Sequence, residues 1–257
     1  MTDQNSNITA EKQFQNDIIS QMQAHGWQLG NSADYDRENA IIQSDVLHYI
    51  KTTQAEEWQK FCAIYPKDTE KNFISLLVKQ LAKAKNDATS KESRTYGTLG
   101  VLRHGLKTRN VRFSLCQFKP ENSRNPTILE HYRQNICRMI PELVYSPYAT
   151  PAELTETGTQ AKKYRIDLVL FINGLPVATL ELKSEFKQSV DNATTQYKTT
   201  RNPTYANNKI EPLLTFKRGA LVHFAVSQYQ VYMTSHLKGK DSNFLPFNQG
   251  TSEGGAG

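Results

Sequence analysis

YRIDLVLFINGLPVATLELK, which spans residues 164–183, contains two runs of residues rich in β-branched and aromatic side chains. The turn-forming pair Asn173-Gly174 separates the two runs, so the stretch predicts a β-hairpin. Three charged residues lie inside this hairpin at positions that packing does not explain: Asp167, Glu181 and Lys183. Because side chains alternate between the two faces of a strand, Glu181 and Lys183 lie on the same face.

The register of the hairpin determines whether Asp167 joins that face. A two-residue loop places Asp167 opposite Leu180, which leaves a carboxylate among leucines. A longer loop or a bulge places Ile172 opposite Pro176 and Asp167 opposite Glu181; the further facing pairs are then Val169–Thr179 and Phe171–Val177. In this second register the other face is wholly apolar, with Ile166, Leu168 and Leu170 against Leu182, Leu180 and Ala178. Because a slip of one residue exchanges the two faces of a strand, the hydrophobic pattern favours the second register.

Two carboxylates that face each other predict metal chemistry. They repel, and the repulsion destabilises a sheet. A divalent cation between them removes that cost, and Mg²⁺ commonly takes only one or two carboxylates and keeps several waters. A lysine beside such an ion can orient or deprotonate a water molecule. The competing interpretation is structural: Asp167 is a charge at the end of a strand, and Glu181 and Lys183 form a solvated pair.

The order Asp167, thirteen residues, then Glu181-Leu182-Lys183 resembles the PD-(D/E)xK nuclease motif. The surrounding sequence resembles the N-terminal region of the R (restriction) subunit of type I restriction-modification enzymes. The stretches that carry this resemblance are HGWQLGNSADYDRENAI (25–41), GTLGVLRHGLK (97–107), FKPENSRNP (118–126), DLVLFINGLPVATLELK (167–183), QYKTTRNP (196–203), FKRGALVHFAVS (216–227) and FLPFNQG (244–250). The nuclease motif alone is weakly specific, whereas this ordered series is strongly specific.

The resemblance implies an α/β fold of the restriction-endonuclease type, a mixed β-sheet flanked by helices. It also implies Mg²⁺-dependent hydrolysis of DNA phosphodiester bonds. Asp167 and Glu181, with the carbonyl of Leu182, would hold the metal, and Lys183 would position or activate the attacking water. The rival interpretations are a catalytically idle DNA-binding or subunit-docking module, and a PD-(D/E)xK nuclease of another pathway such as repair.

Two further elements of the family are altered in this chain. PD-(D/E)xK folds often carry an extra acid on the first helix, just after an aromatic residue; here that position is Gln15, with Asp17 two residues further on, so the third acid is open. R subunits commonly have a QxxxY element in the helix after the hairpin, which supports the catalytic residues. Tyr197 matches its tyrosine, but Ala193 stands where the glutamine is expected and Gln196 precedes Tyr197 directly. We assign a supporting role to Tyr197 and Gln196.

Basic residues near the hairpin are candidates for phosphate contacts. They are Lys162, Lys163 and Arg165 before the first strand, and Lys198 and Arg201 after the second. For the first three, a solvated entry to the strand is an equally open interpretation. The net charge of +6 suggests a polyanionic partner. The three cysteines are not in metal-ligand spacing, there is no secretory signal, and the apolar runs are strand-sized, so we expect a cytoplasmic protein with reduced thiols and no membrane span.

We expect a mainly helical elaboration over residues 1–95, a nuclease core over residues 96–249 and a linker over residues 250–257. Apolar spacing predicts helices over residues 8–27, 38–49, 55–65, 69–85, 127–136 and 189–200, and a second hairpin over residues 220–234. No GxxxxGK[ST] loop occurs. The resemblance therefore implies an N-terminal fragment, with ATP bound only by a motor region beyond this chain. It also implies DNA, a modification (methyltransferase) subunit and a specificity subunit as partners, the last of which would read the bases.

Overall fold

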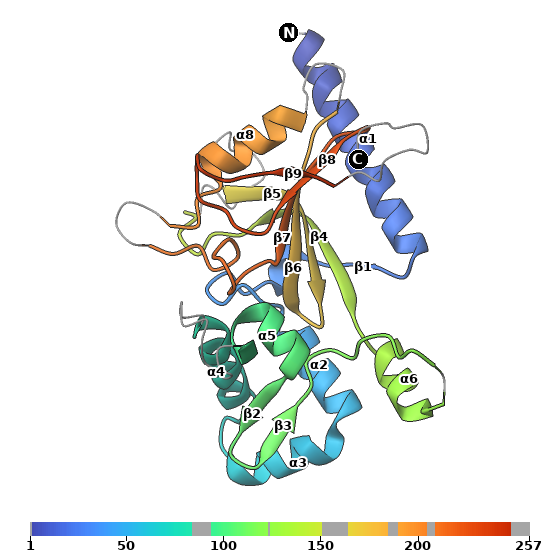
Figure 1. Cartoon of the computed structure of the whole chain (residues 1–257), viewed down its shortest axis with the longest axis vertical. Helices are drawn as coiled ribbons and strands as arrows, with labels where there is room; N and C mark the ends of the chain where they lie inside the picture. The colour runs from blue at the N-terminus through green and yellow to red at the C-terminus, as the bar shows by residue number, and fades with distance from the viewer. Residues whose placement is uncertain are drawn as a thin grey trace.

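A computed structural model describes residues 2–83, 94–122, 124–150, 164–184, 190–204 and 209–247, with side chains from residue 10 onward. Its centre is a seven-stranded sheet with the order β1-β4-β5-β6-β7-β8-β9 (Figure 1). The strands are β1 (Gln28–Leu29), β4 (Cys137–Val144), β5 (Arg165–Ile172), β6 (Leu175–Leu182), β7 (Val222–Val226), β8 (Val231–Thr234) and β9 (Leu245–Pro246). The pairs β1–β4 and β6–β7 are parallel and the other neighbours are antiparallel. The predicted α/β fold with a mixed sheet is confirmed.

The central pair β5–β6 is the predicted hairpin, and a bulge sets its register. Asn173 and Gly174 form a two-residue turn in which both residues have positive φ (+49° and +78°), as a type I′ turn requires. Beyond the turn, the register shifts between Leu170 and Phe171, so that the pairs become Leu170–Ala178, Val169–Thr179 and Leu168–Leu180, as the apolar pattern predicts.

The prediction is wrong only near the turn. Ile172 pairs with Leu175 and Phe171 with Pro176, because the bulge, and not a longer loop, supplies the extra residue, Val177. Proline has no N–H to donate to the ladder and is tolerated at such irregular positions.

Helices cover both ends of this sheet (Figure 1). They are α1 (Thr2–Ala24), α2 (Gln43–Thr53), α3 (Ala55–Ile64), α4 (Thr69–Ala82), α5 (Gly97–His104), α6 (Pro126–Arg133) and α8 (Val190–Thr200), with the short 3-10 turn η1 (Ser32–Asp34). A separate two-stranded sheet, β2 (Leu106–Thr108) and β3 (Val111–Phe113), accompanies α2–α5 near the tip of the β5–β6 hairpin, whereas α1 and α8 lie toward its open end. Within the described ranges, none of the helices has the length and apolar character that crossing a membrane requires.

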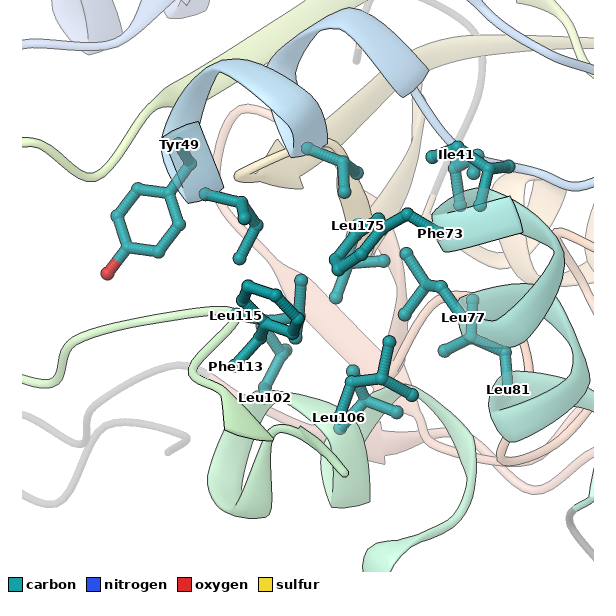
Figure 2. Packing of buried hydrophobic residues seen from close by; sticks show 14 of the residues in the cluster. Ile41, Tyr49, Phe73, Leu77, Leu81, Leu102, Leu106, Phe113, Leu115 and Leu175 are labelled. Atoms are coloured by element: carbon teal, nitrogen blue, oxygen red, sulfur yellow. The ribbon is translucent and has the colours of Figure 1, made fainter. Parts of the chain in front are cut away.

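A large apolar cluster fills the space between α2–α5, β2–β3 and the hairpin tip (Figure 2). Its buried members are Ile41, Val46, Tyr49, Ile50, Phe61, Phe73, Ile74, Leu77, Leu81, Val101, Leu102, Leu106, Val111, Phe113, Leu115 and Leu175. The rings of Phe61, Phe73 and Phe113 meet edge to face, with centroids 5.1–5.7 Å apart. The boundary predicted between residues 95 and 96 falls inside this cluster, since residues from both sides of it pack together.

Candidate active site

The open end of the hairpin brings Asp167 and Glu181 near each other. The observed strand pairs end at Leu168–Leu180, and continuing this register by one residue sets Asp167 opposite Glu181. The charge of Asp167 also contributes to the raised pKa of Glu181. Asp167 Oδ2 accepts a hydrogen bond of 2.7 Å from the backbone N–H of Leu182. Because the N–H and C=O groups of one strand residue point to the same edge, the Leu182 carbonyl also faces the side of β6 on which Asp167 lies. The Asp167 carboxylate and the Leu182 carbonyl therefore lie at the same edge of β6, and Glu181 directly precedes Leu182 in that strand.

Glu181 is completely buried and is held through one of its two oxygens. Arg201 Nε donates to Glu181 Oε1 at 2.7 Å, and the two residues are 0% and 1% exposed. Glu181 Oε2 is buried and has no hydrogen-bond partner among the described residues. Burial and the neighbouring Asp167 raise the pKa of Glu181 to about 8, against the opposing effect of Arg201. A carboxyl group in this environment gains from a cation at Oε2.

Asp167 lies beside further charges. Burial of its carboxyl group raises its pKa, and Lys183 and the Leu182 N–H oppose that shift. Glu142 also raises it. Glu142 has a positive φ of 52° and stands between the ladder pairs Pro141–Leu168 and Leu143–Ile166, which places it opposite Asp167. The irregularity in β4 thus brings another carboxylate next to the open end of the hairpin.

Lys183 points toward helix α1, where Glu11 binds it. Its Nζ donates to Glu11 Oε1 at 3.1 Å, and its side chain is 12% exposed. Burial lowers the pKa of Lys183, but the carboxylates of Asp167, Glu11 and Glu181 outweigh burial and the net pKa is raised. The side chain is therefore an ammonium ion at neutral pH.

Helix α1 contributes Gln15 and Glu11 to the site, and not Asp17. Gln15 is buried and its Nε2 donates to the Asp167 carbonyl at 2.6 Å and to Glu142 Oε1 at 3.2 Å. Asp17 is exposed and accepts a hydrogen bond from Gln13 on its own helix. Sequence reasoning missed Glu11, although its position four residues before Gln15 puts both on one face of the helix and would have identified it.

Tyr197 of α8 is joined to the strand that carries Glu181. Its hydroxyl and the Thr179 hydroxyl are 2.8 Å apart, and Thr179 Oγ1 is 2.8 Å from His223 Nδ1, all in the protein interior. Burial lowers the pKa of His223 to about 3, so its ring is neutral. Ala193, at the expected glutamine position, packs with Val190 and Ala225 instead. The contact joins α8 to β6, and the supporting role of Tyr197 stays a prediction.

Gln196 is half-buried, and its backbone carbonyl accepts a hydrogen bond from Thr200 Oγ1 at 2.7 Å. The contact belongs to the helix itself, so the supporting role of Gln196 stays a prediction.

Of the five predicted phosphate-binding residues, the structure describes three, and these three lie in different surroundings. Lys162 and Lys163 lie outside the described residues. Lys198 is half-buried on α8, and Arg165 contacts Glu142 with its guanidinium at 3.4 Å. Arg201 corrects the prediction: it lies in the interior, where Glu181 compensates its charge, and it is not on the surface where a phosphate would reach it.

The donor set fits Mg²⁺. In the part of the chain that the structure describes, no three His, Cys, Asp or Glu side chains are grouped so that they could hold one ion. Mg²⁺ does not need three, because it commonly uses one or two carboxylates with carbonyl and water oxygens. Glu181 Oε2, which has no hydrogen-bond partner in the described part of the chain, and the raised pKa of both carboxyl groups are the observations that favour a cation here.

Comparison with known proteins gives one match. The family model described as type I restriction enzyme R protein N terminus matches residues 8–242. This range contains every residue of the site, from Glu11 to Arg201. The comparisons with curated proteins and with solved structures found no match.

Proposed function

This chain belongs to the type I restriction enzyme R protein N-terminus family, and from this premise we propose that it is the endonuclease region of such an enzyme. The proposed reaction is the Mg²⁺-dependent hydrolysis of DNA phosphodiester bonds at Asp167 and Glu181. The enzyme would act on DNA in a complex with modification and specificity subunits, and cleavage would be coupled to ATP-driven translocation by a separate motor region.

One observation carries this proposal. Asp167 and Glu181 lie together at the open end of the hairpin, both with a raised carboxyl pKa, and Glu181 Oε2 is a buried oxygen without a hydrogen-bond partner among the described residues. Such a pair is costly for the fold alone, because burial and mutual repulsion both disfavour the charged forms. A pair of carboxyl groups that costs stability and has strongly shifted pKa values supports a catalytic role.

The residues divide the work as follows. Asp167, Glu181 and the Leu182 carbonyl would hold Mg²⁺, which when bound would polarise the phosphate and lower the pKa of a water molecule. Leu182 N–H keeps the Asp167 carboxylate in position by holding Oδ2. Gln15 Nε2 donates to the Asp167 backbone carbonyl and so holds this part of β5 against α1.

Lys183 acts as a donor in this proposal and not as a base. A lysine ammonium has three N–H groups, and Glu11 takes one of them. The other two would bind a non-bridging phosphate oxygen and the attacking water. Because its pKa is raised, Lys183 keeps its proton at neutral pH and stabilises the negative charge that develops on the phosphate.

The test is cleavage by the restriction complex that contains this chain in its R subunit. Asp167→Asn and Glu181→Gln should each reduce DNA cleavage by at least about 10²–10³-fold, the usual loss when one electrostatic contact to a transition state is removed. ATP hydrolysis and translocation should stay at the wild-type rate, because they belong to the motor region. Asp17→Asn is the matched control, since this exposed acid on α1 takes no part in the site, and it should cut DNA normally.

The outcomes separate the proposed function from its alternative. Full cleavage by Glu181→Gln would exclude the site. DNA binding by the wild-type chain without any binding of Mn²⁺, used as a probe in place of Mg²⁺, would favour a module that binds DNA and does not cut it.

A further inference from the structure

Arg201 ties the end of α8 to both strands of the hairpin. It follows Thr200, the last residue of α8, and its guanidinium enters the interior. Nε donates to Glu181 Oε1 of β6, Nη2 donates to the carbonyl of Arg165 in β5, and Nη1 is 3.1 Å from Thr200 Oγ1. Arg165 stands two residues before Asp167. The guanidinium therefore fixes the Glu181 carboxylate relative to the strand that carries Asp167.

The contact with Glu181 uses one carboxylate oxygen and leaves the other. A guanidinium can grip both oxygens of a carboxylate with two parallel N–H bonds. Here Nη2 is directed to the Arg165 carbonyl, and Nε reaches Oε1. Glu181 Oε2 stays buried without a partner among the described residues. Arg201 thus orients the carboxylate through Oε1 and leaves Oε2 available to another ligand.

We infer that Arg201 is a positioning residue: by holding Glu181 through Oε1, it presents Oε2 to the metal ion. The inference rests on the proposed function, since it takes Glu181 as a metal ligand. A group that orients a metal ligand typically matters for metal affinity by about 10–100-fold.

The experiment measures Mn²⁺ binding to the chain by calorimetry, and the Mg²⁺ dependence of DNA cleavage by the complete complex. Arg201→Gln should raise the Mn²⁺ dissociation constant and the half-saturating Mg²⁺ concentration by about 10-fold or more. Most of the maximal cleavage rate should return at saturating Mg²⁺, because Arg201 does not touch the phosphate in this proposal. Arg201→Lys should fall between wild type and Arg201→Gln, since a single ammonium cannot hold Glu181 and the Arg165 carbonyl in the geometry of a fork.

The matched control is Arg138→Gln. Arg138 forms an ion pair with Asp45 through Nε and Nη2 at 2.6 and 2.8 Å, away from the site and also largely buried. Loss of this pair should lower the melting temperature without changing the half-saturating Mg²⁺ concentration. The control distinguishes a general loss of stability from a specific change in the orientation of the Glu181 carboxylate.

Each result decides the inference. A wild-type Mg²⁺ dependence in Arg201→Gln would overturn it, and a wild-type dependence in Arg201→Lys would show that charge alone suffices. If both Arg201 variants fail to fold while Arg138→Gln folds, Arg201 serves the fold and the positioning role is wrong. If Glu181→Gln and Asp167→Asn bind Mn²⁺ and cut DNA like wild type, the proposed function itself fails, whatever Arg201 does.

Discussion

Both ends of the β5–β6 hairpin are buried, but the tip has apolar neighbours and the open end has charged ones. At its tip, Leu175 belongs to an apolar cluster in which Phe61, Phe73 and Phe113 meet edge to face. At its open end, Glu181 is equally buried but shares its surroundings with Asp167, Lys183 and Arg201. The same two strands thus run from an apolar cluster at the tip to a group of four charged side chains at the open end.

This difference separates the residues that stabilise the protein from the residues that we propose to act on DNA. Aromatic pairs in the geometry of the tip contribute about 0.5–1.5 kcal/mol each beyond the burial of their area. A buried ion pair, by contrast, often contributes nothing over a well-packed apolar pair, because both charges lose their hydration. The tip anchors the hairpin, and the anchored strands can then hold carboxylates in positions that the fold alone does not favour.

The largest effect on stability should come from the apolar end. Phe73→Ala should lower the free energy of unfolding by about 3–5 kcal/mol, because it removes a fully buried ring and leaves a cavity among Phe61, Phe113 and their neighbours. Urea unfolding measures this loss. Mn²⁺ affinity of the folded fraction should not change, because the ring lies at the opposite end of the hairpin from the carboxylates.

Phe118→Ala is the control for Phe73→Ala. Phe118 is 56% exposed, so its truncation should change stability by no more than about 0.5 kcal/mol. A loss of less than 1 kcal/mol in Phe73→Ala, or an altered Mn²⁺ affinity, would contradict the division between the two ends.

Burial of Glu181 at the charged end should make the free energy of unfolding depend on pH. Glu181 has a pKa of about 8 in the folded protein and an ordinary value of 4.5 when unfolded. A raised carboxyl pKa gives a stability contribution that is present below the unfolded value and is lost as the pH rises toward the folded value. Between pH 5 and pH 7, without divalent cations, this group should therefore cost the protein roughly 2–3 kcal/mol of unfolding free energy.

Glu181→Gln isolates this contribution, because the amide cannot ionise. The groups whose pKa Glu181 raises, such as Lys183 and Arg201, keep their protons throughout this pH range. The difference between wild type and Glu181→Gln in urea unfolding should grow with pH, with the wild type losing more stability. Mn²⁺ at about 100 times its dissociation constant should return about 2.7 kcal/mol to the wild type and nothing to the variant. Parallel pH profiles for the two proteins would mean that Glu181 is ionised without cost.

The sequence predicts the position of the turn and the register of the hairpin beyond the bulge, because both follow from local pattern. Asn173-Gly174 specifies the turn, and the wholly apolar second face specifies the register from Leu170 onward. The bulge changes the pairs next to the turn, since the pattern fixes which faces match but not where the extra residue lies. Helix α5 was not predicted: its glycines Gly97 and Gly100 disfavour a helix, and burial of Val101 and Leu102 in the apolar cluster overrides that preference.

The remaining errors concern contacts between distant parts of the chain. Glu11 and Lys183 are 172 residues apart, and nothing local to either residue shows that they meet. Arg201 looks like any surface arginine in the sequence, because its burial depends on Glu181 in another element. The boundary predicted at residue 95 stays a prediction, and the apolar cluster contains residues from both sides of it.

The smallest predicted effect concerns the polar contact that supports the charged end. Tyr197→Phe removes the hydroxyl 2.8 Å from Thr179 Oγ1 but leaves Thr179 its contact with His223. Since no partner is left without a hydrogen bond, the loss of unfolding free energy should be about 1 kcal/mol. Tyr35→Phe is the matched control: the Tyr35 hydroxyl is buried with no hydrogen-bond partner in the described part of the chain, so its removal should be neutral or stabilising. Equal losses in both variants, measured by urea unfolding, would mean that the Tyr197–Thr179 contact adds nothing to the strand that carries Glu181, and that α8 is held there by apolar packing alone.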